Sequence, residues 1–128
     1  ASNRAELEAA RLAIIREKSD ALIVALDPLF FSLRSITVDI AAKRRLPAVY
    51  PLLPYSDQGG LLSYGFNLRD SYKRAAGYVD RILKGAKPRD LPIERPLRFE
   101  LVVNLRTAKQ LGLTIPQTVL FRADRVIE

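Results

Sequence analysis

Hydrophobic positions along this chain alternate between a helical and a strand period, which predicts alternating helices and strands. Apolar residues recur at helical spacing over residues 3–18, where Asn3 and Glu6 suit the cap and first turn of a helix. A continuous apolar run then occupies residues 21–26. Such a run is typical of a strand that is buried on both faces of a parallel sheet.

The next segment predicts one long helix that follows this strand directly. Asp27 is a favoured N-cap residue and Pro28 suits the first helical position, so we expect the helix to begin there. Cations at residues 43–45 close it, because positive charge is favoured at the C-terminal end of a helix. Its apolar stripe consists of Leu29, Leu33, Ile36 and Ile40.

Two short strands, a loop and a second long helix are predicted in the middle of the chain. The strands are expected at residues 47–51 and 61–65, and a loop with a proline and a Gly-Gly pair at residues 52–60 between them. Asn67 is expected to cap the helix, and Gly85 to end it. The apolar stripe of this helix consists of Tyr72, Ala76, Val79 and Leu83.

The last third of the chain begins with a proline-rich segment, residues 87–96, which is expected to be an irregular connector. A fourth strand is predicted at residues 99–103, followed by helices at residues 106–111 and 116–126. This order predicts an α/β fold, a partial parallel sheet with flanking helices. Because the chain opens on a helix without a preceding strand, we expect it to be a piece of a larger α/β protein.

Composition narrows the functional classes. The chain has 128 residues, of which 48% are hydrophobic, and this suffices for one domain with a core. It contains no Cys, His or Met. The absence of Cys and His excludes disulfides, zinc fingers and every catalytic triad that needs an imidazole. We therefore expect neither an enzyme nor a bound cofactor or metal, and the absence of Met indicates a processed or excised chain.

The net charge of +7 favours anionic partners or simple solubility. The basic residues are scattered, however, and no aromatic residues interleave with the densest run at residues 43–45. Stacking aromatics are what a single-stranded nucleic-acid site requires, so we expect no nucleic-acid partner. No apolar run approaches the roughly 20 residues of a membrane-spanning helix.

Seven collinear motifs carry a resemblance to a known family. The chain resembles the C-terminal part of ABC-transporter solute-binding proteins of the tryptophan/tyrosine type. The motifs are ALIVALDPLFF (21–31), LPAVY (46–50), GGLLSYG (59–65), AAGYVDRILKGAKP (75–88), LPIE (91–94), FELVVN (99–104) and TAKQLGLTIP (107–116). They cover nearly the whole chain, and they are specific as a set although each alone is weak.

The resemblance implies a type I periplasmic-binding fold, in which two α/β lobes close on a small ligand and deliver it to a membrane permease. It implies that residues 1–66 form part of the C-terminal ligand-binding lobe, and that residues 97–128 return to it. Residues 67–86 would be a helix that packs on the first lobe, which is missing here, and residues 87–96 the connector. Family members are periplasmic, or are anchored at the outer face of the membrane.

Without the first lobe, the helix over residues 67–86 would expose its apolar stripe. Soluble monomers seldom expose such a patch, so two copies of the chain are expected to form a homodimer by exchanging this helix. The alternative is that the helix folds back on its own sheet and the chain stays monomeric.

Ligands of open α/β sheets bind beyond the carboxyl ends of the strands. The candidate ligand-binding residues are therefore Asp27, Tyr50, Ser63, Tyr64 and Gly65. Asp27 would pair with the ammonium of an amino-acid ligand, and Tyr64 would offer an aromatic face. A purely structural interpretation also stands for each: Asp27 as an N-cap, Tyr64 as packing where two lobes join, and Gly65 as a source of backbone freedom.

The leading functional hypothesis is solute capture for an ABC importer, with a small organic ligand such as an aromatic amino acid. One alternative is a ligand-sensing regulatory domain of the same fold, as in transcription repressors. Another is a nucleotide-handling α/β enzyme. The Gly59-Gly60 pair counts against that enzyme, because no Lys-Ser/Thr follows it and a strand comes next, unlike a phosphate loop.

Overall fold

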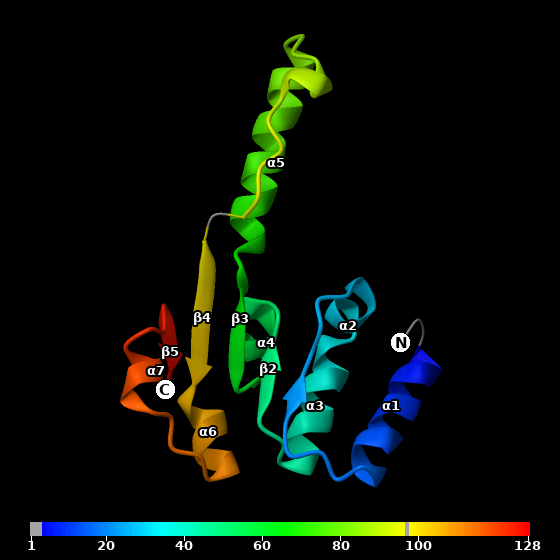
Figure 1. Ribbon diagram of the computed structural model, residues 1–128, viewed down its shortest axis with the longest axis vertical. Coiled ribbons are helices and arrows are strands. Elements are labelled where there is room, and N and C mark those ends of the chain that lie inside the picture. The colour runs from blue at the N-terminus through cyan, green and yellow to red at the C-terminus, as the bar shows by residue number, and fades with distance from the viewer. Residues whose placement is uncertain (1–3, 97) are drawn as a thin grey trace.

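The chain folds into a sheet flanked by helices, with one long helix standing apart from it (Figure 1). The computed structural model describes residues 4–96 and 98–128, so the predicted cap Asn3 lies outside the described residues. In chain order the elements are α1 (Arg4–Arg16), β1 (Leu22–Ile23), α2 (Pro28–Ser32), α3 (Arg34–Arg44), β2 (Ala48–Tyr50), α4 (Leu53–Asp57), β3 (Leu62–Phe66), α5 (Leu68–Leu83), a 3₁₀ turn (Pro88–Asp90), β4 (Phe99–Asn104), α6 (Leu105–Leu111), α7 (Gln117–Leu120) and β5 (Arg125–Ile127).

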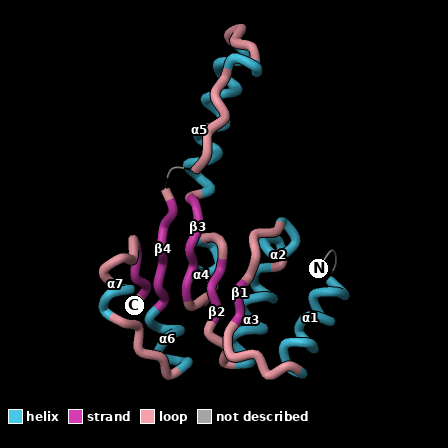
Figure 2. The backbone as a smooth tube through the Cα atoms, in the orientation of Figure 1, coloured by secondary structure: helices cyan, strands magenta, loops and turns pink. Residues whose placement is uncertain are grey.

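The predicted α/β class is confirmed by a five-stranded sheet of order β1-β2-β3-β4-β5. Parallel pairing joins β1 to β2, β2 to β3 and β4 to β5. The central pair is different, because β3 and β4 run antiparallel from Leu62↔Val103 to Phe66↔Phe99. The chain therefore leaves the sheet along β3 and comes back along β4, with α5 between them (Figure 2).

The first strand is shorter and more exposed than its apolar run predicts. The expectation of a strand over residues 21–26, buried on both faces, is wrong, since β1 holds only two residues. Ile23 is 83% exposed, whereas Val24 is buried against the core. Strand β1 is at the edge of the described sheet, so it has one strand neighbour instead of two.

Two helical predictions also need correction. The single helix expected over residues 28–45 is broken at Leu33 into α2 and α3, because Leu33 has a non-helical backbone (φ −101°, ψ 25°). The expected loop over residues 52–60 contains the short helix α4, which begins with Pro54 in its first turn, where the missing amide hydrogen costs nothing.

The C-terminal part differs from prediction in two places. The proline-rich segment holds one 3₁₀ turn, in which Pro88 occupies the first position and Leu91 N donates to Pro88 O. The last predicted helix is only the four-residue α7, and a fifth strand follows it where helix was expected to continue to residue 126. Parallel pairing with β4 is what makes residues 125–127 a strand.

Helix α5 projects away from the sheet and does not fold back on it (Figure 1). Asn67 caps it as predicted, since its side chain accepts from Arg69 N (3.0 Å) and Asp70 N (3.3 Å). The returning segment runs along one side of α5. There Tyr78 Oη donates to Pro92 O (2.6 Å), and Arg74 pairs with Glu94 (2.8 Å).

The core lies on the face of the sheet that α3 and α4 cover. It consists of Val24, Val38, Ala41, Ala48, Tyr50, Leu52 and Tyr55. Side chains alternate across a strand, so the intervening residues of β3 and β4 point to the opposite face. There Tyr64 is 57% exposed and Phe99 is 49% exposed. One face of this sheet is therefore packed, and the other keeps much of its apolar surface uncovered.

Gly65 is required at its position by a close backbone contact. A Cβ built on Gly65 would lie 1.8 Å from Pro51 O, far inside any allowed separation. Gly65 is not among the residues with positive φ, so the predicted role of backbone freedom is wrong and the reason for glycine is space. Pro51 directly follows β2, and its carbonyl can approach β3 because no side chain intervenes.

We expect Gly65→Ala to lower the free energy of unfolding by about 2–3 kcal/mol, because the added methyl group would push the β3 and Pro51 backbones apart. Urea unfolding followed by circular dichroism measures this. The matched control is Gly77→Ala in α5, where nothing lies within 4 Å of the new Cβ. That change should be neutral or stabilise by up to about 1 kcal/mol. Equal destabilisation by both changes would contradict the steric explanation.

Candidate functional site

The candidate site lies where the carboxyl ends of β1 and β2 meet at one edge of the sheet. Asp27 follows β1 at this edge and caps α2 as predicted. Its Oδ1 atom accepts from Leu29 N (2.8 Å) and from Phe30 N (3.3 Å). Both cap bonds therefore use the same oxygen, and the contacts of the described residues leave Oδ2 able to accept from another donor.

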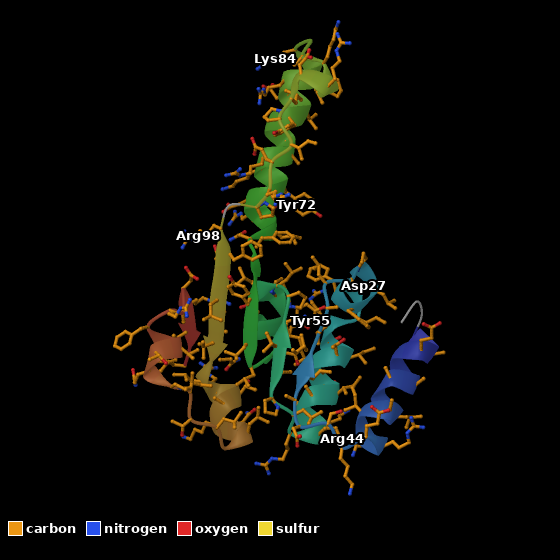
Figure 3. All side chains as sticks on the ribbon, viewed as in Figure 1. Asp27, Arg44, Tyr55, Tyr72, Lys84 and Arg98 are labelled. Carbon is orange, nitrogen blue, oxygen red and sulfur yellow. The ribbon has the colours of Figure 1, made fainter. Side chains whose placement is uncertain are left out.

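A column of aromatic rings and one guanidinium extends from α2 into the core. The Arg34 guanidinium lies over the Phe31 ring, 5.0 Å from its centroid, and donates to Phe31 O (3.1 Å). Phe31 meets Tyr55 edge to face at 6.3 Å. Tyr55 stacks on Tyr50 at 4.9 Å with the ring planes 17° apart. The column thus connects the start of α3 to the end of β2, and Figure 3 shows Tyr55 in the region below Asp27.

Three polar atoms in this column are buried without a hydrogen-bond partner among the described residues: Tyr50 Oη, Tyr55 Oη and Arg34 Nε. Burial raises the pKa of Tyr50 to about 12, and the neighbouring Tyr55 adds to the rise. Burial also raises the pKa of Tyr55; the Arg34 charge opposes this rise and the Asp27 charge adds to it. Both tyrosines are therefore neutral at physiological pH, and Tyr55 lies close enough to Asp27 to respond to its charge.

Tyr50 and Ser63 were predicted at the ligand surface, and the structure places both of them in the core. Tyr50 is 1% exposed and Ser63 is 0% exposed. Ser56 Oγ donates to Ser63 Oγ (2.8 Å), and Asn104 Nδ2 donates to Ser56 O (3.3 Å). In this conformation neither Tyr50 nor Ser63 presents surface to a ligand, so direct contact by either one stays a prediction.

Tyr64 lies apart from the other candidates. It extends from the face of β3 opposite to Ser63, and its ring stacks on Phe99 with centroids 5.6 Å apart. Gly65 is buried by the approach of Pro51. The structure therefore brings Asp27 near the aromatic column that contains Tyr50, and it does not bring Tyr64 to that place.

Sequence reasoning missed Arg34 and Ser56 as parts of this region. The 0% exposure of Tyr55 assigns it to the core. Arg34 stands at the start of α3, after a helix break at Leu33 that left no sequence signal. The unpredicted helix α4 is what brings Ser56 to Ser63, seven residues further along the chain.

Over residues 4–96 and 98–128, no three Asp or Glu side chains cluster in a way that would hold a metal ion. Within the same ranges, no helix has the length and hydrophobicity to span a bilayer.

Comparison with known proteins identifies the family. The profile of the family "ABC transporter substrate binding protein" matches residues 1–127. The chain belongs to this family. Its members are substrate-binding proteins and not enzymes, which confirms the expectation that this chain is not an enzyme. A search of curated proteins gave no match.

Solved structures show the same fold. A conserved domain protein from Vibrio cholerae is 32% identical, with a TM-score of 0.89 over 98% of this chain and 42% of that one. An ABC domain from Streptococcus pneumoniae in complex with L-Trp is 29% identical, with a TM-score of 0.82 over 93% of this chain and 41% of that one. The open, ligand-free substrate-binding protein CD0873 from Clostridium difficile is 22% identical, with a TM-score of 0.62 over 99% of this chain and 42% of that one, and shows the fold alone. This chain spans about two fifths of the length of these structures.

The buried tyrosines predict a specific loss of stability at alkaline pH. An unfolded Tyr ionises near pH 10, whereas folded Tyr50 ionises near pH 12, so the folded state binds more protons between these values. The free energy of unfolding is therefore unaffected by Tyr50 ionisation below about pH 10, and it falls as the pH rises toward 12. We expect the free energy of unfolding of Tyr50→Phe to fall by about 2 kcal/mol less than that of the wild type over this alkaline range. At pH 7 the change should be neutral or stabilising, because the buried hydroxyl has no partner among the described residues.

Urea unfolding at several pH values between 7 and about 11.5 measures this difference. Tyr72→Phe is the matched control, because Tyr72 is 70% exposed. A wild-type protein and a Tyr50→Phe variant with parallel pH profiles would contradict the buried-tyrosine explanation.

Proposed function

We propose that this chain is the ligand-binding part of the C-terminal lobe of an extracytoplasmic solute-binding protein that serves an ABC importer. Residues 1–66 and 97–128 would form that lobe, residues 67–86 would pack on the other lobe, and residues 87–96 would connect the two. Family membership supports the solute-binding role. The projection of α5 away from the sheet supports the division of the chain.

The proposed ligand is an aromatic amino acid, and the observation that carries this proposal is the placement of Asp27. Its carboxylate lies at the carboxyl edge of the parallel strands, with Oδ2 left for a donor such as a ligand ammonium. The Streptococcus relative was solved with L-Trp, which supports a ligand of this class. Tyr64 would supply an aromatic face where the chain crosses toward the other lobe.

The 128-residue chain alone should bind amino acids weakly or not at all. A small-molecule pocket encloses roughly 70–90% of its ligand, and this chain spans about two fifths of its structural relatives. The surfaces that would cover the second side of the ligand are therefore outside it. Isothermal titration of L-Trp, L-Tyr and L-Phe tests this expectation, and submicromolar binding of any of them would contradict the two-lobe proposal.

Asp27→Asn separates the capping role from the proposed ligand role. Asn caps helices about as well as Asp, so stability should change by less than about 0.5 kcal/mol. In the full-length protein, affinity for L-Trp should fall by roughly 10- to 100-fold, because a charge-assisted bond to the ammonium is lost. Titration calorimetry measures the affinity, and thermal unfolding measures the stability.

Indole-3-propionate provides the ligand control, because it has the ring and carboxylate of L-Trp without the ammonium. Its affinity should be unchanged by Asp27→Asn. Asp27→Ala should lower stability by about 1 kcal/mol through loss of the cap. Unchanged L-Trp affinity in Asp27→Asn would show that Asp27 serves the helix alone.

A further inference from the structure

Arg34 is a cation without an anionic partner inside the candidate site. Its side chain is partly buried, and it forms no ion pair with any of the described residues. Its Nη1 atom donates to Phe31 O (3.1 Å), and the guanidinium lies 5.0 Å from the centroid of the Phe31 ring. Removing a charge from water is costly unless an opposite charge compensates it. The guanidinium of Arg34 is therefore available to an anion.

The edge of this guanidinium formed by Nε and Nη2 is the part that remains free. Nε is buried and has no hydrogen-bond partner in the described part of the chain. Nη2 has no partner there either, and it is not among the buried atoms, so it reaches the surface. The N–H groups along one edge of a guanidinium are parallel and match the two oxygens of a carboxylate. Because Nη1 is bonded to Phe31 O, this edge is held in one orientation before any anion arrives.

Arg34 lies at the same edge of the sheet as Asp27. Asp27 caps α2, and Arg34 is the first residue of α3, which follows α2 directly. Burial is the main cause of the raised pKa of Tyr55, and the charges of Arg34 and Asp27 act on that pKa in opposite directions, so both lie within reach of its hydroxyl. Asp27 and Arg34 form no ion pair with each other. Two opposite charges that stay apart around one hydroxyl match the ammonium and the carboxylate of an amino acid.

We propose that Arg34 binds the carboxylate of the ligand along its Nε–Nη2 edge, while Asp27 binds the ammonium. This inference rests on the proposed function and deepens it, because it requires the ligand to carry a carboxylate. A bound carboxylate gives Nη2 an acceptor and gives the buried Nε the partner that it lacks. A ligand without a carboxylate leaves these donors unpaired, and such unpaired groups are how a polar site rejects the wrong ligand. Arg34 is thus the residue that selects amino acids over the corresponding amines and amides.

Titration calorimetry of the full-length protein tests the Arg34 contact. Arg34→Gln should weaken the binding of L-Trp and of indole-3-propionate roughly 10- to 100-fold, because both probes carry the carboxylate. L-Trp amide keeps the ammonium and replaces the carboxylate by a neutral amide. It should bind the wild type roughly 10- to 100-fold more weakly than L-Trp does, and Arg34→Gln should not change its affinity. Arg34→Lys should recover only part of the L-Trp affinity, because an ammonium supplies charge without the paired donors.

Arg44→Gln is the matched control, since Arg44 is an exposed cation at the opposite end of α3, away from Asp27 (Figure 3). Its L-Trp affinity should equal that of the wild type. Equal weakening of L-Trp and L-Trp amide by Arg34→Gln would show that Arg34 supports the protein instead of the ligand, and would overturn the proposal. A wild-type protein that binds L-Trp amide as tightly as L-Trp would overturn it without any variant.

The same titrations separate this inference from the proposed function. Unchanged L-Trp affinity in Arg34→Gln would overturn the Arg34 contact and leave the aromatic amino acid as the proposed ligand. A wild-type protein that binds indole-3-propionate through Arg34 but does not bind L-Trp would overturn the amino-acid ligand and support the carboxylate contact. A wild-type protein that binds neither probe would overturn both.

Discussion

The antiparallel pairing of β3 with β4 is the constraint on which the rest of this structure depends. Five residue pairs, from Leu62↔Val103 to Phe66↔Phe99, hold the outgoing and returning strands side by side. They fix the base of α5, and β4 in turn carries β5 and α6. Gly65 makes the pairing compatible with β2, because Pro51 O occupies the space where a Cβ would lie. A small steric requirement at one residue therefore underlies both the sheet and the projecting helix.

Helix ends were predictable from the sequence wherever a single residue determines them. Asp27, Asn67 and Gly85 mark helix ends as expected, because a capping side chain or a glycine with positive φ acts within a few residues. The exposure of Ile23 and the strand character of residues 125–127 were not predictable. Each depends on which strands lie beside it in the sheet. The neighbour of residues 125–127 is β4, which is distant in the sequence, and β1 has a neighbouring strand on one side only in the described sheet.

In the candidate site, too, features set by local sequence were predictable and features set by three-dimensional packing were not. Asp27 was identified because strand ends in α/β folds are where ligands bind, and the cap geometry confirms its position. The burial of Tyr50 and Ser63 was missed because each is covered by α4, a helix that begins at Leu53 inside an expected loop. Contacts such as Tyr50 with Tyr55 and Ser56 with Ser63 follow from packing in three dimensions, and no periodicity along the chain reports them.

The aromatic column gives Asp27 an environment suited to the role proposed for it. Burial keeps Tyr50 and Tyr55 neutral, so no tyrosinate competes with Asp27 for a cation at physiological pH. Rings that exclude water also lower the local dielectric, which strengthens a charge-assisted bond made at the edge of the column. Arg34 is held over Phe31 and bonded to Phe31 O, so its charge is fixed in place and does not swing onto Asp27. The packing that stabilises the core thus also keeps the Arg34 guanidinium from occupying the Asp27 carboxylate, as the proposed bond to a ligand ammonium requires.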